Sequence, residues 1–302
     1  MQSARTKLIG AALLSLALPL TAQAAATLEN NYILAGVSDY GTLGSNKTTS
    51  PGILFDPTGL SIYGINDFLA PGTPYEGFYI TSSAGNYQSN NTGHSSNNFL
   101  SFALDQISAT VVNATANSND GLLGISNLYS LTTIGSRSVI EITTTLTNNG
   151  TGALDRLNFL RTLDPDPDVN AYTIYDTINT TLSSDQACAT GAKTGQTLCI
   201  FTADTRTHNA GVSASWAKNP ATFLAGTNSG NGDFVLGIGF DLGSLGAGNS
   251  LSFTYAYALG ETLDIASGGS TGGAVPEPAS TLLIATGVLG LAGMRRFGRR
   301  RG

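Results

Sequence analysis

Alternation of apolar and polar residues is the feature that most restricts how this chain can fold. The stretches 234–242 and 251–259 carry large apolar side chains at every second position, and 140–147 alternates in the same way. A period of two turns one face of an extended strand towards a core and the other towards solvent. No internal segment keeps a helical period, which disfavours parallel sheets with crossover helices. The sequence therefore predicts an all-β, antiparallel protein.

Glycine and asparagine mark the turns between these strands. The Gly-rich link 243–249 predicts an antiparallel hairpin between the runs on either side of it. Asn148-Asn149-Gly150 is a strong turn signal, after which 157–163 is predicted to be the return strand. The body of about 240 residues is large for one sandwich of ~100 residues. We expect a large antiparallel β-sandwich, with either many strands or two stacked sandwiches.

The N-terminal residues 1–24 have the pattern of a secretory signal peptide. Two basic residues precede an apolar run, and the small residues Ala22 and Ala24 occupy the −3 and −1 positions that signal peptidase requires. Cleavage is expected after Ala24, with Ala26 as the second choice. Signal peptidase is therefore an expected partner.

The C-terminal stretch 275–302 has three parts. It consists of the run Val275, Pro276, Glu277 and Pro278, the uncharged segment 279–294, and the basic tail 295–302 with five arginines. Sixteen helical residues span about 24 Å, so 279–294 is predicted to be a short single transmembrane helix. The arginines would keep the end of the chain in the cytoplasm and leave the body outside. A Gly/Ser linker, 267–274, is expected to join this tail to the extracellular body, 25–266.

This three-part tail resembles the PEP-CTERM sorting signal of Gram-negative exopolysaccharide producers. The resemblance implies that a membrane-embedded exosortase cleaves near 275–278, after the chain is held transiently in the inner membrane through 279–294. It also implies export to the cell surface or the extracellular matrix, with exopolysaccharide as a partner. The two prolines fit this role because they keep the backbone extended and open to a protease.

The charge of the body argues against a nucleic-acid partner. The whole chain has a formal charge of −6, but residues 26–274 hold seven basic against nineteen acidic residues, a charge of −12. Such a body repels phosphate backbones. A divalent cation or a neutral glycan is easier to accommodate.

Cys188 and Cys199 are the only cysteines. Export carries them into an oxidising compartment, where a disulfide across a hairpin or Ω-loop is expected. No histidine lies near them in the sequence, so they make a poor zinc site.

One acidic segment is a candidate Ca²⁺ site. Oxygen-bearing side chains alternate in it, at Asp164, Asp166, Asp168 and Asn170. In an extended chain they project to one side and can surround a cation if the loop curves. The segment departs from an EF-hand, because Val169 and Tyr175 replace the expected Gly and Glu. The plainer and preferred interpretation is a solvated acidic turn made rigid by two prolines.

No catalytic motif stands out in the sequence. His94 and His208 have no partner at motif spacing, and Trp216, Tyr172 and Tyr175 are candidates for stacking on sugar rings, although packing is the commoner role of such aromatics. We expect a non-enzymatic structural or adhesive component of an exopolysaccharide or biofilm matrix. The alternative is a carbohydrate-binding or polysaccharide-modifying β-sandwich enzyme. An enzyme should present carboxylates converging at ~5–10 Å, whereas an adhesin should present a flat or aromatic-lined surface.

Overall fold

The part of the chain that the structure describes folds into antiparallel sheets with three short helices. The computed structural model describes residues 26–44, 51–69, 75–91, 97–134, 137–226 and 230–269. Within these ranges every named strand pair is antiparallel. The all-β prediction is confirmed.

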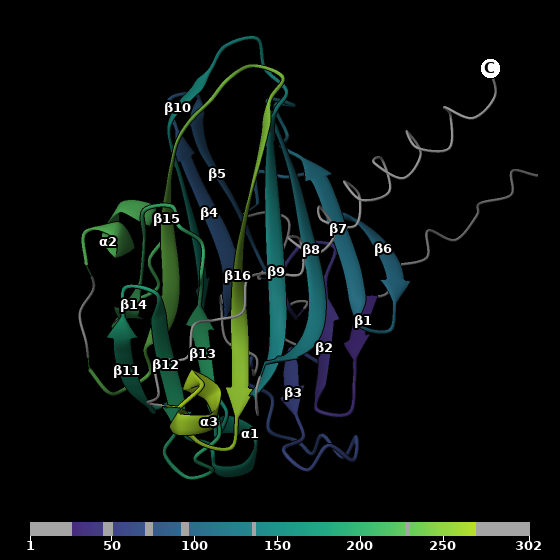
Figure 1. The fold of residues 1–302 in the computed structure, drawn as a ribbon, viewed down its shortest axis with the longest axis vertical. Coiled ribbons are helices and arrows are strands. Elements are labelled where there is room, and N and C mark those ends of the chain that lie inside the picture. The colour runs from purple at the N-terminus through teal and green to yellow at the C-terminus, as the bar shows by residue number, and fades with distance from the viewer. Residues whose placement is uncertain are drawn as a thin grey trace, which may run out of the picture.

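The largest sheet has eight strands, which Figure 1 shows side by side across the molecule. Their order is β11 (Thr177–Ser183), β12 (Gln186–Gly191), β13 (Thr197–Phe201), β16 (Ser250–Gly260), β9 (Arg137–Asn148), β8 (Leu123–Ile134), β7 (Val111–Asn117) and β6 (Ala103–Ser108). The inward positions of β9, among them Ile140, Ile142 and Leu146, are fully buried. The predicted alternation of this strand is therefore confirmed.

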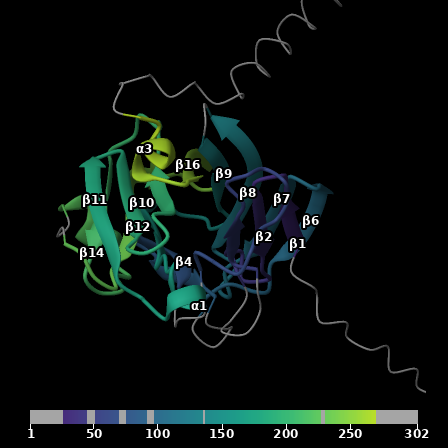
Figure 2. The same cartoon turned by 90° about the horizontal axis from the view of Figure 1, so that it is seen from below.

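Two smaller sheets form the opposite layer of the sandwich. The five-stranded sheet has the order β14 (His208–Ser213), β15 (Val235–Leu245), β10 (Leu154–Leu163), β4 (Glu76–Ser82) and β5 (Gly85–Asn90). The three-stranded sheet has the order β1 (Ala26–Glu29), β2 (Ile33–Val37) and β3 (Ile53–Phe55). Seen from below, β11 and β14 lie together on one side of the molecule and β1 and β6 on the other (Figure 2).

One hydrophobic core fills the space between the layers and draws on strands of all three sheets. Its centre is aromatic, with ring centroids 4.8 Å apart for Phe159 and Phe253 and 5.0 Å apart for Phe240 and Phe253. Offset and edge-to-face aromatic pairs of this kind add stability beyond the area they bury. The structure is thus a many-stranded sandwich in two layers.

Two of the three described helices pack on the outer faces of the sheets. Helix α1 (Val169–Tyr172) follows β10, α2 (Pro220–Leu224) packs Phe223 against the outer face of the five-stranded sheet, and α3 (Leu263–Ser267) packs Ala266 on the eight-stranded sheet. Asn219 begins α2 by accepting a hydrogen bond from the N–H of Ala221, a standard N-cap.

The two predicted hairpins are wrong. Strand β15 pairs with β10 and β14, whereas β16 pairs with β9 and β13, so the two strands lie in different sheets. Strands β9 and β10 are separated in the same way. The connections 149–153 and 246–249 therefore cross from one layer to the other. The apolar faces that alternation predicted meet across the core instead of lying side by side on one sheet.

The predicted disulfide is present. Cys188 and Cys199 lie directly opposite each other on β12 and β13, with 4.0 Å between their Cα atoms. Both are buried beneath α3, in an outer cluster that includes Phe201 and Ala266. The bridge closes a hairpin, one of the two settings expected from the sequence.

Candidate functional site

A charged pair lies at the centre of the sandwich, between the two layers. Arg161 on β10 and Glu76 on β4 both face inward, and Nε of the arginine donates to Oε1 of the glutamate at 2.5 Å. Neither side chain has any exposed surface. The pair sits diagonally on neighbouring strands, because Glu76 lies opposite Leu163 and Arg161 lies opposite Phe78.

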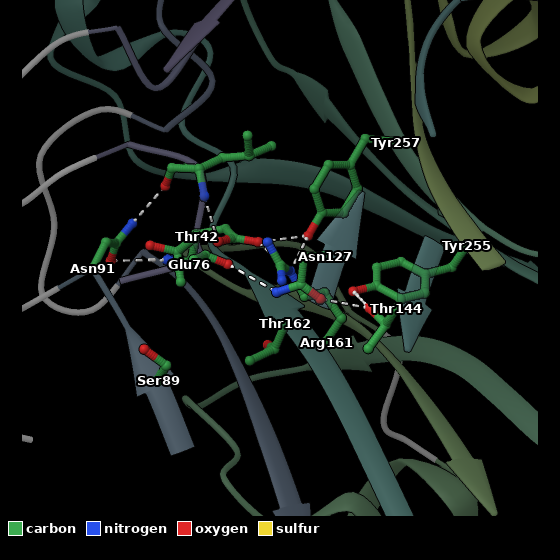
Figure 3. Close-up of polar contacts among 12 residues, drawn as sticks. Thr42, Glu76, Ser89, Asn91, Asn127, Thr144, Arg161, Thr162, Tyr255 and Tyr257 are labelled. Carbon is green, nitrogen blue, oxygen red and sulfur yellow. Dashed lines mark hydrogen bonds and ion pairs between the residues drawn. The ribbon is translucent and has the colours of Figure 1, made fainter. Parts of the chain in front are cut away.

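Hydroxyl groups from the eight-stranded sheet complete this network (Figure 3). The Tyr257 hydroxyl donates to Glu76 at 2.8 Å, and Arg161 Nη2 donates to the Tyr129 hydroxyl at 2.9 Å. Glu76 Oε2 also accepts from the Leu43 N–H at 2.9 Å. The network therefore joins both main sheets and the loop that follows β2.

The electrostatics of this centre are those of a fully buried ion pair with a structural role. Burial raises the pKa of Glu76, while Arg161, Tyr257 and the Leu43 amide oppose the rise. Burial by itself would lower the pKa of Arg161, but the charge of Glu76 together with the neighbouring tyrosines raises it well above its usual value, so Arg161 stays charged. Because the pair is fully buried, it has no surface to offer a ligand. We assign it to holding the layers together.

The four residues of the predicted Ca²⁺ site do not come together. Asp164 and Asp166 share one cluster, which is joined by Asp233 from the segment before β15. Asn170 is exposed on α1, where its amide donates to the Ile65 carbonyl at 2.8 Å. Asp233, the third carboxylate of this cluster, is not among the residues predicted from the sequence.

Asp168 is hydrogen-bonded to a different loop. Its carboxylate accepts the backbone N–H of Lys193 at 2.6 Å, and the N–H and hydroxyl of Thr194 at 3.1 Å and 2.6 Å. These bonds hold the β12–β13 turn against the start of α1. The side chain is only 1% exposed, so its oxygens face this loop and not solvent.

An open cleft lies on the outer face of the five-stranded sheet, beside the start of α2. It has a volume of about 700 Å³. Tyr79 of β4 and Trp216 form part of its wall, with ring centroids 6.4 Å apart at an interplanar angle of 73°. The indole N–H donates to the Tyr79 hydroxyl at 2.6 Å, which fixes the half-buried tryptophan ring in the cleft.

The other side chains of this cleft are polar and mostly uncharged. They are Thr81, Asn86, Tyr87, Gln88, Asn98, Lys218, Asn219 and Thr222, together with Ile80. Amides and hydroxyls around an aromatic wall provide hydrogen bonds and an apolar contact face in one site. Among these lining residues there is no carboxylate and no histidine, and Lys218 is the one charged group.

The structure separates the three aromatic residues predicted as sugar-stacking candidates. Trp216 lines the cleft, whereas Tyr172 and Tyr175 are 53% and 47% exposed at α1 and just after it. Tyr79 was not predicted, because its place in an apolar run of β4 resembles that of a core residue. Its outward direction follows from alternation with Phe78 and Ile80, which face the core.

A second, shallower cleft of about 470 Å³ lies on the outer face of the eight-stranded sheet. Threonine and serine form cross-strand pairs along this face, such as Thr145 with Ser252 at 2.7 Å and Thr147 with Ser250 at 2.8 Å. Its lining residues also lack carboxylates and histidines. The face is therefore polar but uncharged around the cleft.

Several predicted residues lie outside the described part of the chain. They are the signal-peptidase positions Ala22 and Ala24, the run Val275, Pro276, Glu277 and Pro278, the segments 279–294 and 295–302, and His94. In the residues that the structure does describe, no helix has the length and apolar character needed to cross a membrane.

Comparison with known families identifies one short region. The family model described as the PEP-CTERM protein-sorting motif matches residues 274–296. No curated protein matches the chain.

Solved structures resemble the body in fold. A bacterial glucoamylase complexed with acarbose matches with a TM-score of 0.50 and 9% identity, over 82% of this chain and 33% of the glucoamylase. The chain thus spans about a third of that enzyme's length, and at this identity the likeness shows the fold alone. A putative aldose 1-epimerase from Escherichia coli K12 matches over 78% of this chain and 98% of its own, with 13% identity and a TM-score of 0.43.

Proposed function

We propose that this chain, which carries the PEP-CTERM protein-sorting motif at residues 274–296, is a non-catalytic, glycan-binding component of an extracellular polysaccharide matrix. The motif implies an exported protein that is anchored in the membrane during sorting and processed by an exosortase. Placement in the matrix and attachment to its polysaccharide are the proposed steps. The processed body then resides at the Gram-negative cell surface or in its exopolysaccharide.

The observation that carries the proposal is the composition of the Trp216 cleft. An aromatic wall supported by Tyr79 can contact the apolar face of a sugar ring, and the surrounding amides can bind its hydroxyls. Glycosidases need a pair of carboxylates on either side of the scissile bond. The described lining residues of the cleft include none, which favours binding over hydrolysis.

Lys218 suggests the class of glycan. It is exposed, and it forms no ion pair with any residue in the described ranges. On an acidic body, a cation in the cleft favours polymers with carboxylate groups, such as those containing uronic acids. We therefore expect binding that weakens as salt is added, because exposed charges are screened.

The test measures glycan binding by the exported wild-type protein, two variants of the cleft and one control variant. Trp216→Ala removes the aromatic wall and is expected to abolish binding to uronic-acid polysaccharides on a glycan array and in calorimetry. Lys218→Ala should weaken binding and remove most of its salt dependence. Tyr172→Ala is the matched control, an exposed aromatic outside the cleft, and should bind like the wild type. Equal binding by the wild type and Trp216→Ala would overturn the proposal.

A further inference from the structure

The acidic cluster of Asp164, Asp166 and Asp233 lies at one end of the paired strands β10 and β15. Asp164 and Asp166 follow the last residue of β10, and Asp233 lies just before the first residue of β15. Because these strands run antiparallel with Leu163 opposite Leu236, the end of one lies beside the start of the other. Two segments distant in sequence thus bring three carboxylates to one point.

The spacing of these carboxylates suits a single ion. One oxygen from each residue lies within 4.8 Å of the other two. Calcium binds oxygen ligands at about 2.3–2.6 Å, so two oxygens on one Ca²⁺ are at most about 4.6–5.2 Å apart. Three oxygens 4.8 Å apart lie about 2.8 Å from their common centre, so shifts of a few tenths of an ångström at most would place all three on the same ion.

Asp166 supplies an independent indication that this cluster binds a ligand. It is 3% exposed, and in the described part of the chain its Oδ1 has no hydrogen-bond partner. No Lys, Arg or His of the described residues forms an ion pair with any of the three carboxylates. A buried carboxylate without hydrogen bonds or a countercharge is costly, and proteins usually pair such a group or use it to bind a metal.

Other buried aspartates of the same protein show the usual solution. Asp168 is 1% exposed and accepts three hydrogen bonds from the β12–β13 turn. Asp67 is 4% exposed and accepts the backbone N–H groups of Gly52, Ile53 and Leu69. The fold thus supplies hydrogen-bond donors to Asp67 and Asp168. It places Asp166, in contrast, beside the carboxylates of Asp164 and Asp233.

The backbone holds the cluster in place. The N–H of Asp164 donates to the Tyr75 carbonyl and that of Asp166 to the Phe68 carbonyl, each at 2.9 Å. On the other side, Gly232 exchanges two backbone hydrogen bonds of 3.0 Å with Thr177. The carboxylates consequently cannot separate easily to relieve their repulsion.

The energetic cost of the cluster also appears in its proton affinity. Burial and the Asp233 charge raise the pKa of Asp164 to about 7. Burial, with the charges of Asp164 and Asp233, raises the pKa of Asp166 to about 8. A divalent cation would remove this repulsion and favour the ionised carboxylates.

We propose that Asp164, Asp166 and Asp233 bind one Ca²⁺ ion. Carboxylate oxygens are hard ligands, and calcium accepts irregular shells of six to eight oxygens that include water. Asp233 is exposed, so water can reach the ion and complete its coordination. The ion would fasten the segment before β15 to the end of β10. Asp168 and Asn170, which the sequence analysis included, are outside this ligand set.

The test is Ca²⁺ titration of the exported protein after treatment with EDTA and dialysis. Calorimetry should show one bound Ca²⁺ per chain, and millimolar Ca²⁺ should raise the melting temperature by several degrees over EDTA. Asp166→Asn and Asp233→Asn should each lose both responses. Asp168→Asn is the matched control, since it should lower the melting temperature through its lost turn contacts but keep the response to Ca²⁺.

Folding of the variants is checked in EDTA. Asp166→Asn should then melt at or above the wild-type temperature, because the substitution removes one carboxyl group from a buried, mutually repelling cluster. Identical wild-type melts with Ca²⁺ and EDTA would overturn the proposal. So would a calcium response that survives in Asp166→Asn and Asp233→Asn, or one that is lost in Asp168→Asn. Glycan binding through the Trp216 cleft is measured separately, so either proposal can fail alone.

Discussion

The described tyrosines of this molecule have very different surroundings. Tyr129 and Tyr257 have no exposed surface and bind Arg161 through their hydroxyls, whereas Tyr172 is 53% exposed. Between these extremes, Tyr79 is 2% exposed and supports Trp216 from beneath. A buried phenol is stable only while it is neutral, because its anion would lose the solvation that water provides.

Alkaline titration is therefore expected to separate the tyrosines. Burial raises the pKa of Tyr79 to about 12, and burial together with the Asp120 carboxylate raises that of Tyr87 to about 12. The unfolded chain releases these protons near pH 10, before the folded chain does. Stability should thus be full below about pH 10 and fall as the pH rises towards 12.

Phenolate absorbance and melting temperature measure this effect together. Tyr79→Phe should remove absorbance from the late phase, near pH 12. Titration of all tyrosines near pH 10 in protein that is still folded would contradict the burial described here.

Between the strands, the hydrogen bonds and the ion pair of the polar network replace part of the packing contacts that an apolar core would supply. Arg161 and Glu76 connect β10 and β4, and the tyrosine hydroxyls carry the connection to β16 and β8. Buried ion pairs contribute little net stability relative to apolar replacements, but loss of one partner leaves an uncompensated charge. The network is thus expected to behave as a unit.

Substitutions in the pair should reveal this coupling. Arg161→Met and Glu76→Gln are each expected to lower the free energy of unfolding by about 3–5 kcal/mol, as measured by urea denaturation. The double variant Arg161→Met, Glu76→Gln should lose less than the sum of the single changes. Arg206→Met breaks an exposed pair with Asp204 and should cost at most about 1 kcal/mol. Additive losses in the double variant would show that the two residues do not act together.

The elements also show what the sequence can predict. Alternation identified the strands and their buried faces, since Leu236, Ile238 and Phe240 are all fully buried. It could not identify their partners, because a strand buries the same face whether the next strand lies beside it or opposite it. The Gly-rich link 243–249 therefore predicts a hairpin, although the connection between the two strands, 246–249, crosses between layers. The disulfide was predictable because only two cysteines were available.

The candidate sites were less predictable for the same reason. Asp164 ends one apolar run and Asp233 begins another, but only the pairing of β10 with β15 brings them together. Proximity in the chain suggested Asp168 instead, whose carboxylate faces the β12–β13 turn. Trp216 could be proposed from the sequence because it is the single tryptophan. Tyr79 could not, because its place in the cleft depends on which face of β4 is covered.

Considered as a whole, the molecule has two parts with separate tasks in the proposed function, the sorting motif and the body. The motif at 274–296 implies export and processing, and it determines where the chain goes. The body presents an aromatic cleft on one outer face and a Thr- and Ser-rich face on the other. In the proposed function, the first process delivers the protein and the cleft then retains it in the polysaccharide.

Retention of the exported protein in the matrix is the decisive measurement for the proposed function. Producing cells that carry the wild-type chain, Trp216→Ala or Tyr172→Ala are separated into extracellular matrix and free medium, and the protein in each fraction is quantified. All three chains should be exported and processed equally, with the wild type and Tyr172→Ala in the matrix and Trp216→Ala in the medium. The polysaccharide should keep its chain length in every case. A Trp216→Ala protein that stays in the matrix, or polysaccharide shortened by the wild type alone, would contradict a non-catalytic protein held by this cleft.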